Sequence, residues 1–171
     1  MITYRDALST DGALLGGLAR ATFLETFGNL YTLPDLESFL AGVSDAEYTA
    51  QLADPDIEVR LAEVAGVPIG FCKISSLKLP ADTDEASAME LRQLYIFRPW
   101  HGVGIADVLT RWALERARAR GAGEMWLSVF TENPRARRFY ARYGFVEIAP
   151  YRFMVGNQAD EDILCRISLR D

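Results

Sequence analysis

The sequence of 171 residues predicts an α/β fold of the α+β kind, in which a mixed sheet is flanked by helices. Its length suits a single domain covering residues 1–171, and half of the residues are apolar while a quarter are charged, as in ordinary globular proteins. Residues 57–75 alternate in polarity and turn back on themselves, which predicts an antiparallel hairpin. The second half alternates strand-like and helix-like segments, which favours strands joined by helices.

Three helices are predicted ahead of the hairpin, after a short first strand at residues 2–5. Apolar residues recur at helical spacing over residues 11–26, which predicts an amphipathic helix. Pro34 suits the first turn of a second helix, because proline already has a helical φ and lacks the N–H that would be unpaired there. Ser44 suits the N-cap of a third helix over residues 44–53.

Strand patterns dominate the rest of the chain. Residues 57–64 alternate apolar and polar side chains, and Ala65-Gly66 turns the chain into a second strand at 67–75. Residues 78–85 are polar and are expected to form an exposed connector. Beyond it, the predicted order is a strand at 89–97, a helix from Gly104 to about Gly121, a strand at 125–130, a helix at 133–143, and strands at 145–148 and 163–169.

The charge of the chain is acidic and unevenly distributed. The net charge of −6 argues against nucleic-acid binding, which needs a basic face. Residues 1–97 hold 15 acidic and 6 basic side chains, whereas residues 98–171 hold 9 acidic and 12 basic ones. Two interpretations stay open: chance surface composition, or a pair of ligand parts of which one is anionic and the other cationic.

The sequence predicts neither a membrane protein nor a metal protein. Its apolar runs are strand-length rather than the ~20 residues that cross a bilayer, and its first residues lack a signal-peptide pattern, so we expect a cytoplasmic protein. Cys72 and Cys165 lie in apolar runs and are expected to be buried free thiols. With no CxxC pair and one histidine, His101, no metal site is expected.

A glycine-bearing loop follows the strand that begins near Glu90. Gly102-Val103-Gly104 opens a helix, and the free N–H groups and partial positive charge of a helix N-terminus suit a phosphate. Glycines allow the backbone to approach such an anion closely. The loop lacks the Gly-Lys-Ser/Thr of a nucleotide P-loop, and Asp107 stands where a dinucleotide fingerprint has its third glycine. Taken alone, a plain tight turn is the alternative.

A second motif about thirty residues later resolves this ambiguity. The two stretches together resemble the core motifs of the GNAT superfamily of N-acetyltransferases. The first motif, Gln/Arg-x-x-Gly-x-Gly/Ala, is matched by His101, Gly104 and Ala106, with histidine replacing the commoner first residue. The second, Asn-x-x-Ala-x-x-Phe-Tyr-x-x-x-Gly-Phe, is matched at Asn133, Ala136, Phe139, Tyr140, Gly144 and Phe145.

The resemblance implies a mostly antiparallel central sheet and an acetyl-CoA site with no metal. Leu94 and Ile96 would pair with the pantetheine arm through their main chain. Tyr140 would lie by the sulfur and protonate the departing thiolate, with core packing beside Phe139 as its alternative. The remaining cofactor-binding residues implied by the family are the N–H groups of Val103, Gly104, Ile105, Ala106 and Asp107 around the pyrophosphate, the loop residues His101 and Gly102, and Asn133 and Ala136 beside the pantetheine.

Three further assignments concern side chains with competing interpretations. Glu90 is a candidate for taking the proton of the amine, and a solvated strand-end carboxylate is the equal alternative. Tyr95 and Trp126 are interpreted first as core aromatics. Arg138 and Arg142 are spaced i, i+4 on a predicted helix, so a solvated face and a patch for the CoA phosphates both fit.

The acceptor is indicated more loosely. Residues 21–28, together with residues 153–156 and 163–164, resemble bacterial PaiA-type spermine/spermidine acetyltransferases. The expected partners are therefore acetyl-CoA and a small cationic amine, with no nucleic acid and no membrane, and a homodimer is compatible with the sequence. Acetylation of a protein or peptide, or a non-catalytic acetyl-CoA-binding regulatory domain, are the alternatives. The acids expected near the acceptor are Glu25, Asp35, Glu37, Asp82, Asp84, Glu85 and Glu90.

Overall fold

A seven-stranded sheet in the order β1-β2-β3-β4-β5-β7-β6 runs through the computed structural model, which describes residues 1–170. The strands are β1 Ile2–Asp6, β2 Glu58–Val64, β3 Val67–Ser76, β4 Met89–Ile96, β5 Glu124–Phe130, β6 Val146–Val155 and β7 Gln158–Ser168. The α-helices are α1 Gly12–Phe27, α2 Leu33–Ala41, α3 Asp45–Ala53, α4 Ile105–Ala119 and α5 Pro134–Tyr143, with short 3-10 turns η1 Ser9–Asp11, η2 Gly28–Leu30 and η3 Arg98–Trp100. The predicted mixed sheet with flanking helices is confirmed.

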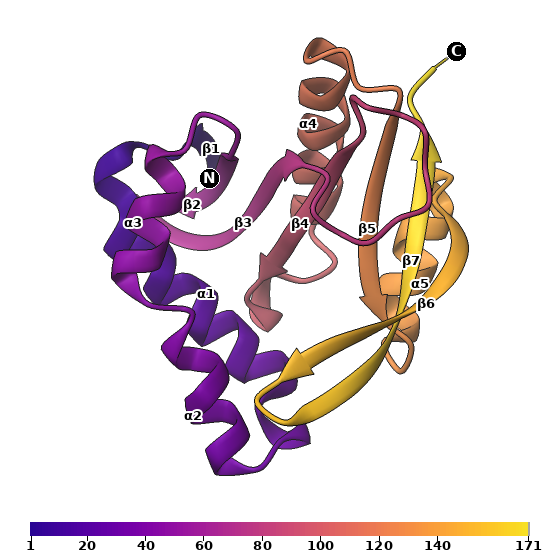
Figure 1. Cartoon of the computed structure of the whole chain (residues 1–171). Coiled ribbons are helices and arrows are strands. Elements are labelled where there is room, and N and C mark those ends of the chain that lie inside the picture. The colour runs from indigo at the N-terminus through magenta and orange to yellow at the C-terminus, as the bar shows by residue number, and fades with distance from the viewer. Residues whose placement is uncertain (171) are drawn as a thin grey trace.

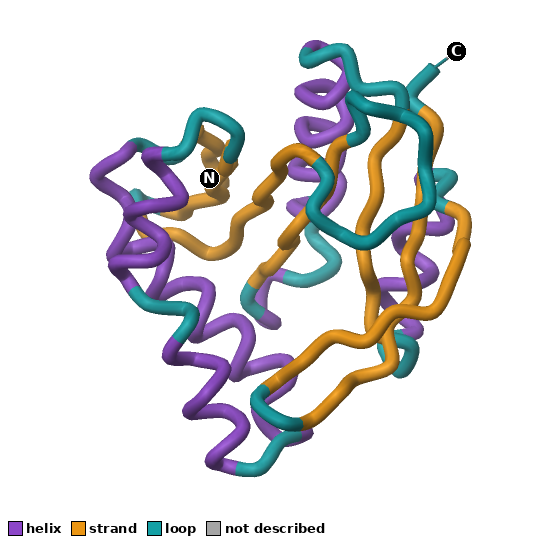
Figure 2. The backbone as a smooth tube through the Cα atoms, in the orientation of Figure 1, coloured by secondary structure: helices purple, strands orange, loops and turns teal. Residues whose placement is uncertain are grey.

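Helices cover both faces of this sheet (Figures 1 and 2). Cys72 of β3 packs in one core cluster with α4 and α5, whereas its neighbour Phe71 packs in another with α1 and α3. Because successive side chains of a strand point to opposite faces, α4 and α5 lie on one side and α1 and α3 on the other. The loop between β3 and β4 covers β5 and β7 on the α1 side, through Leu77 and Leu79 against Trp126 and Leu164.

Pairing is antiparallel throughout the sheet except between β4 and β5. These two strands run parallel and pair only at Met89 with Met125 and at Glu90 with Trp126, after which they diverge. The antiparallel register of β4 with β3 shifts at the same place, since Leu91 faces Ile74 and Gln93 faces Lys73. Arg92 is thus the extra residue of a β-bulge, a feature that bends a strand. The central sheet is therefore open along most of β4.

The local signals of the first half are confirmed. Ser44 caps α3 by accepting a hydrogen bond from Glu47 N, as the sequence predicts. Ala65 and Gly66 both have positive φ, of 51° and 78°, and this left-handed pair fits the right-handed twist of a tight hairpin.

Cys72 and Cys165 are buried free thiols. Among residues 1–170, none of the helices combines the length and apolar character needed to span a bilayer.

The hairpin of β6 and β7 is the main element that the sequence pattern misses. The predicted strands at 145–148 and 163–169 extend towards each other to a turn at Gly156, so that residues 149–162 are largely sheet. Two features hide this hairpin: Pro150 weakens a strand prediction, and Asp160-Glu161-Asp162 offers no apolar alternation. Proline is tolerated because β6 is an edge strand. The tip reaches α2, where Asn157 N donates to Asp35 Oδ1 at 2.8 Å (Figure 1).

Candidate active site

A cavity of about 820 Å³ occupies the gap where β4 and β5 diverge. Its walls come from both faces of the sheet, since α5 contributes residues on one side and α1 on the other. Nearly all of the predicted site residues line it. These are Leu94, Ile96, His101, Gly102, Gly104, Ala106, Asp107, Asn133, Ala136 and Tyr140. Of the others, Val103 is exposed and the Ile105 side chain is buried in the core, although both were assigned backbone roles only.

The N-terminus of α4 forms one end of the cavity. The first hydrogen bond of the helix is donated by Val108 N to Gly104 O, so the N–H groups of Ile105, Ala106 and Asp107 have no carbonyl partner within the helix. Gly102 and Gly104 have φ of 80° and 88°, in the left-handed region that favours glycine. A Cβ added at either glycine would meet no protein atom within 4 Å. The loop therefore presents bare backbone and helix-dipole charge to whatever lies in the cavity.

His101 holds this loop against the end of β4. One ring nitrogen, Nε2, lies 2.7 Å from Ile96 O, and the other, Nδ1, is contacted by Arg135 Nη1. A guanidinium can only donate, so Nδ1 must accept, and Nε2 then carries the proton and donates to the carbonyl. The histidine that departs from the family pattern thus has a structural role, as a bridge between β4 and the start of α5.

The edge of β4 that faces the gap offers backbone groups to an extended ligand. Phe97 N donates to Ile69 O of β3, and residues of an antiparallel pair direct their N–H and C=O towards the partner at alternate positions. The main-chain groups of Leu94 and Ile96 consequently point away from β3. Because β5 has diverged here, they face the cavity, and the Ile96 carbonyl is the one that His101 contacts.

The N-terminal part of α5 forms the wall opposite β4. Asn133 caps the helix, with Oδ1 accepting from Ala136 N at 3.1 Å. Arg138 and Arg142 line the cavity, as does Arg135, so this end carries positive charge. Arg137 instead pairs with Glu147 at 2.8 Å and does not line the cavity. The basic end is therefore built from α5 and the loop before α4.

Tyr140 lies between the two ends. Its ring packs edge-on against Phe139 and Phe145, with centroids 5.4 and 5.6 Å away, and its side chain is 9% exposed. Burial raises the pKa of the Tyr140 phenol, and the nearby Cys72 and Tyr95 add to the rise. The hydroxyl stays protonated at neutral pH and remains available as a proton donor.

The other end of the cavity is acidic and aromatic, and no sequence motif indicated it. Asp160 and Asp162 on β7 line the cavity although they are only 6% and 7% exposed. Both oxygens of Asp160 are engaged, because Oδ2 accepts from Tyr31 Oη and Oδ1 accepts from Gln158 Nε2 at 3.0 Å. Aromatic rings line the same cavity. They are Phe23, Phe27, Tyr31, Phe130 and Phe153.

Burial also changes the titration of Asp162. It raises the pKa of this carboxyl to about 6, the neighbouring Asp160 carboxylate adds to the rise, and the Ser128 hydroxyl opposes it. Strand alternation was the available signal for this site, since residues 160 and 162 of one strand must face the same side. That signal was unusable because the strand itself was predicted to begin only at residue 163.

Glu90 does not belong to the cavity. Its Oε2 accepts hydrogen bonds from Lys78 N at 2.9 Å and Leu79 N at 3.1 Å, so its carboxylate anchors the loop between β3 and β4. The side chain is 7% exposed, which also excludes the alternative of a solvated strand end. The structure thus separates Glu90 from Tyr140, with which the prediction paired it.

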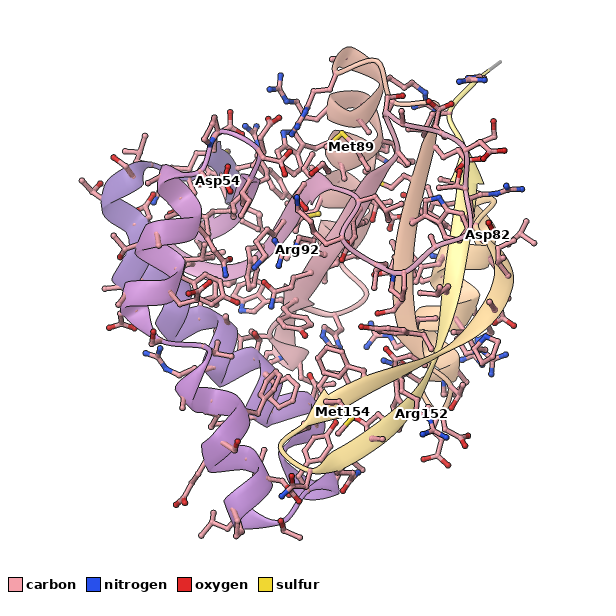
Figure 3. All side chains as sticks on the ribbon, viewed as in Figure 1. Asp54, Asp82, Met89, Arg92, Arg152 and Met154 are labelled. Carbon is pink, nitrogen blue, oxygen red and sulfur yellow. The ribbon has the colours of Figure 1, made fainter. Side chains whose placement is uncertain are left out.

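The other acids expected near the acceptor also lie outside the cavity. Glu25 accepts from Arg98 N, Asp35 from Asn157 N, and Glu85 pairs with Arg170. In Figure 3, Asp82 lies on the loop beside β7, on the far side of the molecule from α1 and α3, whereas Arg92 lies in the central space. The acidity that lines the cavity therefore comes from the second half of the chain, not the first. Tyr95 lines the cavity, whereas Trp126 is a core aromatic, as predicted.

The described residues contain no group of three or more His, Cys, Asp and Glu side chains arranged to hold a metal ion. The site is instead a two-ended cleft, basic and rich in N–H donors at α4 and α5, acidic and aromatic at β7 and α1. A phenol lies between these ends. Such a site suits one anionic and one cationic reactant that meet beside Tyr140.

Known proteins of similar sequence are described as N-acetyltransferases. A family profile described as "Acetyltransferase (GNAT) family" matches residues 24–145. An uncharacterized N-acetyltransferase of Mycobacterium bovis is 30% identical over 154 residues, covering 90% of this chain and 94% of the relative. An uncharacterized N-acetyltransferase of Lactobacillus delbrueckii subsp. lactis is 24% identical over 153 residues, covering 89% and 88%.

Solved structures share the fold. A PaiA N-acetyltransferase from Thermoplasma acidophilum, in complex with coenzyme A, superposes with a TM-score of 0.77 at 20% identity, covering 98% of this chain and 99% of the other. An acetyltransferase from Salmonella typhimurium, solved with acetyl-CoA, superposes with a TM-score of 0.71 at 18% identity, covering 100% and 95%. These identities are low, so the similarity concerns the fold.

The anchoring of the connecting loop by Glu90 gives a first prediction. Glu90→Gln removes the charge that strengthens two hydrogen bonds to Lys78 N and Leu79 N, and we expect a loss of about 1–2 kcal/mol of stability. Trypsin should then cut after Lys78 several times faster. Asp84→Asn, in the same loop and exposed, is the matched control. An unchanged melting temperature and cutting rate in Glu90→Gln would contradict the anchoring role.

Proposed function

The chain belongs to the acetyltransferase (GNAT) family, and from this we propose that it transfers the acetyl group of acetyl-CoA to a primary amine, with a small polycation such as spermidine as the favoured acceptor. The observation that carries the proposal is the two-ended cavity, in which α4, α5 and the divergent β4 form a basic end and β7 forms an acidic one. Transfer occurs by direct attack of the amine, without an acyl-enzyme.

The residues of the basic end fit acetyl-CoA. The free N–H groups of Ile105, Ala106 and Asp107 suit the pyrophosphate, and the open space over Gly102 and Gly104 leaves room for it. The guanidinium groups of α5 suit the remaining phosphate. The edge of β4 suits the pantetheine amides, which can pair with it as an added strand would.

The chain's own residues then assist the transfer. An N–H of β4 at the gap polarises the thioester carbonyl as the amine attacks it, an oxyanion-type contribution. Tyr140 protonates the departing thiolate, since its buried phenol is held neutral and lies in the cavity. Acetyl-CoA supplies the activated acyl group, and the walls of the cavity hold the two reactants together.

The acidic end supports a cationic acceptor. Asp160 and Asp162 place two carboxylates in a mostly apolar wall, where a bound ammonium compensates them better than water does. Aromatic faces from Phe23, Phe27 and Tyr31 attract the same charge through cation–π contact.

Gly104→Val tests the phosphate cradle. The valine side chain would lie in the space assigned to the pyrophosphate, and its positive φ would strain the turn by about 1–2 kcal/mol, so acetyl-CoA affinity should fall at least about tenfold. Gly121→Val is the matched control, because Gly121 has a φ of 79° and equally open space but does not line the cavity. Equal affinities of the two variants by titration calorimetry would remove the cradle from the proposal.

Tyr140→Phe tests the general acid. The substitution keeps the ring contacts with Phe139 and Phe145 but removes the hydroxyl, so kcat should fall roughly 10²-fold while KM for acetyl-CoA changes little. Single-turnover kinetics must show that acetyl transfer limits the rate in both proteins. A variant that keeps most of its kcat under those conditions would assign Tyr140 to packing.

The acceptor is tested by release of free CoA from acetyl-CoA with a panel of spermidine, spermine, a monoamine of similar length, a neutral peptide and an acidic peptide. We expect the two polyamines to give the highest kcat/KM, because each additional ammonium gains from the acidic end. A peptide that wins would favour a peptide N-acetyltransferase instead. Binding of acetyl-CoA with no CoA release from any amine would favour a regulatory domain.

A further inference from the structure

We propose that Asp162 is the residue that takes the proton from the acceptor ammonium, with Asp160 as the fixed charge that tunes it. The inference rests on the proposed transfer to an amine and assigns the acid–base role to β7 rather than to Glu90. The observation behind it is that the Asp162 carboxylate is buried, lines the cavity and has fewer hydrogen-bond partners than Asp160.

The position of Asp162 fits this role. It lies on β7, between β5 and the edge strand β6, paired with Phe130 of β5 and with Tyr151 of β6. The next residue, Ile163, packs in the core cluster on the α4 and α5 face. Because side chains alternate along a strand, the Asp162 side chain points to the opposite, α1 face. Ser128, which also lines the cavity, supplies the neighbouring hydroxyl on β5. The carboxylate therefore lines the same cavity as Leu94 and Ile96 of β4, although β5 lies between the two strands in the sheet.

Asp160 differs from Asp162 in its partners. Tyr31 and Gln158 occupy both of its oxygens, so its carboxylate is fixed and held as an acceptor. Asp162 keeps capacity for an incoming N–H. In this proposal Asp160 attracts the cation and sets the local electric field, whereas Asp162 exchanges the proton.

The surroundings of Asp162 raise the pKa of its carboxyl towards neutral pH. Burial raises its pKa to about 6, with Asp160 adding to the rise, so it is a carboxylate above that pH and can accept a proton. Tyr31, Tyr95 and Tyr151 surround it from three other elements, and burial raises the pKa of each phenol, so these remain neutral. Arg92 and Arg98 are the cationic groups on the β4 side of the same cavity.

The proton balance closes without a further reactant. The ammonium gives one proton to the Asp162 carboxylate, and the neutral amine forms the new C–N bond at the thioester carbonyl. The C–S bond then breaks, the thiolate takes a proton from the Tyr140 phenol, and the phenolate recovers one from the nitrogen of the new amide. Asp162 finally releases its proton to solvent.

The experiment compares four proteins, wild type, Asp162→Asn, Asp160→Asn and Glu161→Gln, by kcat/KM for spermidine from pH 5 to pH 9. Wild type should lose activity below about pH 6, as Asp162 becomes protonated. Asp162→Asn should lose this acid limb and roughly 10²-fold in kcat at pH 7. Asp160→Asn should shift the limb to lower pH, because it removes the charge that raises the pKa of Asp162. Glu161→Gln, an exposed residue between the two, should match wild type.

A second acceptor separates proton transfer from folding or packing. A primary amine less basic than spermidine, such as glycinamide, is already about half neutral at pH 8, so the defect of Asp162→Asn at that pH should shrink severalfold with it. A defect of equal size with both amines overturns the proposal. An acid limb that survives in Asp162→Asn overturns it as well. Wild type that releases no CoA with any amine instead contradicts the proposed function itself.

Discussion

Strands β4 and β5 pair at two positions and then separate, and the rest of the site depends on this separation. The bulge at Arg92 bends β4 at the point where the pairing ends. Backbone groups that lose a strand partner inside a protein cost about 1–3 kcal/mol each when nothing replaces it. On β4 they face a cavity, where water or an extended ligand can satisfy them. The parting of two strands thus converts sheet hydrogen bonding into ligand binding.

Contacts between the elements around the gap between β4 and β5 hold these elements in place. The loop between β3 and β4 covers β5 and β7, and Glu90 anchors that loop from within β4. The hairpin of β6 and β7 reaches across to α2, and Asp35 receives Asn157 N at its tip (Figure 1). Phe23 of α1 packs with Leu36 of α2 and Val155 of β6, so the aromatic side chains of α1 are held in the wall of the cavity. The basic side chains of α5 and the carboxylates of β7 thus line one cavity.

The electrostatics of the cavity follow from the same arrangement. Positive charge gathers at the start of α4 and on α5, where unpaired N–H groups already favour an anion. Negative charge sits on β7, where burial makes it costly until a cation binds. An anion at one end and a cation at the other would both be attracted to a site that is already organised.

The sequence by itself determined what depends on short-range patterns. Gly104 before a helix and Asn133 at the next N-cap act through local backbone geometry, so the glycine loop before α4, the start of α5 and the family could be predicted. Only the tertiary structure decided what depends on distant neighbours. Glu90 lies outside the cavity because its carboxylate accepts hydrogen bonds from the N–H groups of a separate loop. Asp162 lines the cavity because β7 pairs with β5, which precedes it by about thirty residues in the chain. A carboxylate's role is set by what surrounds it, and that environment is assembled only when the sheet forms.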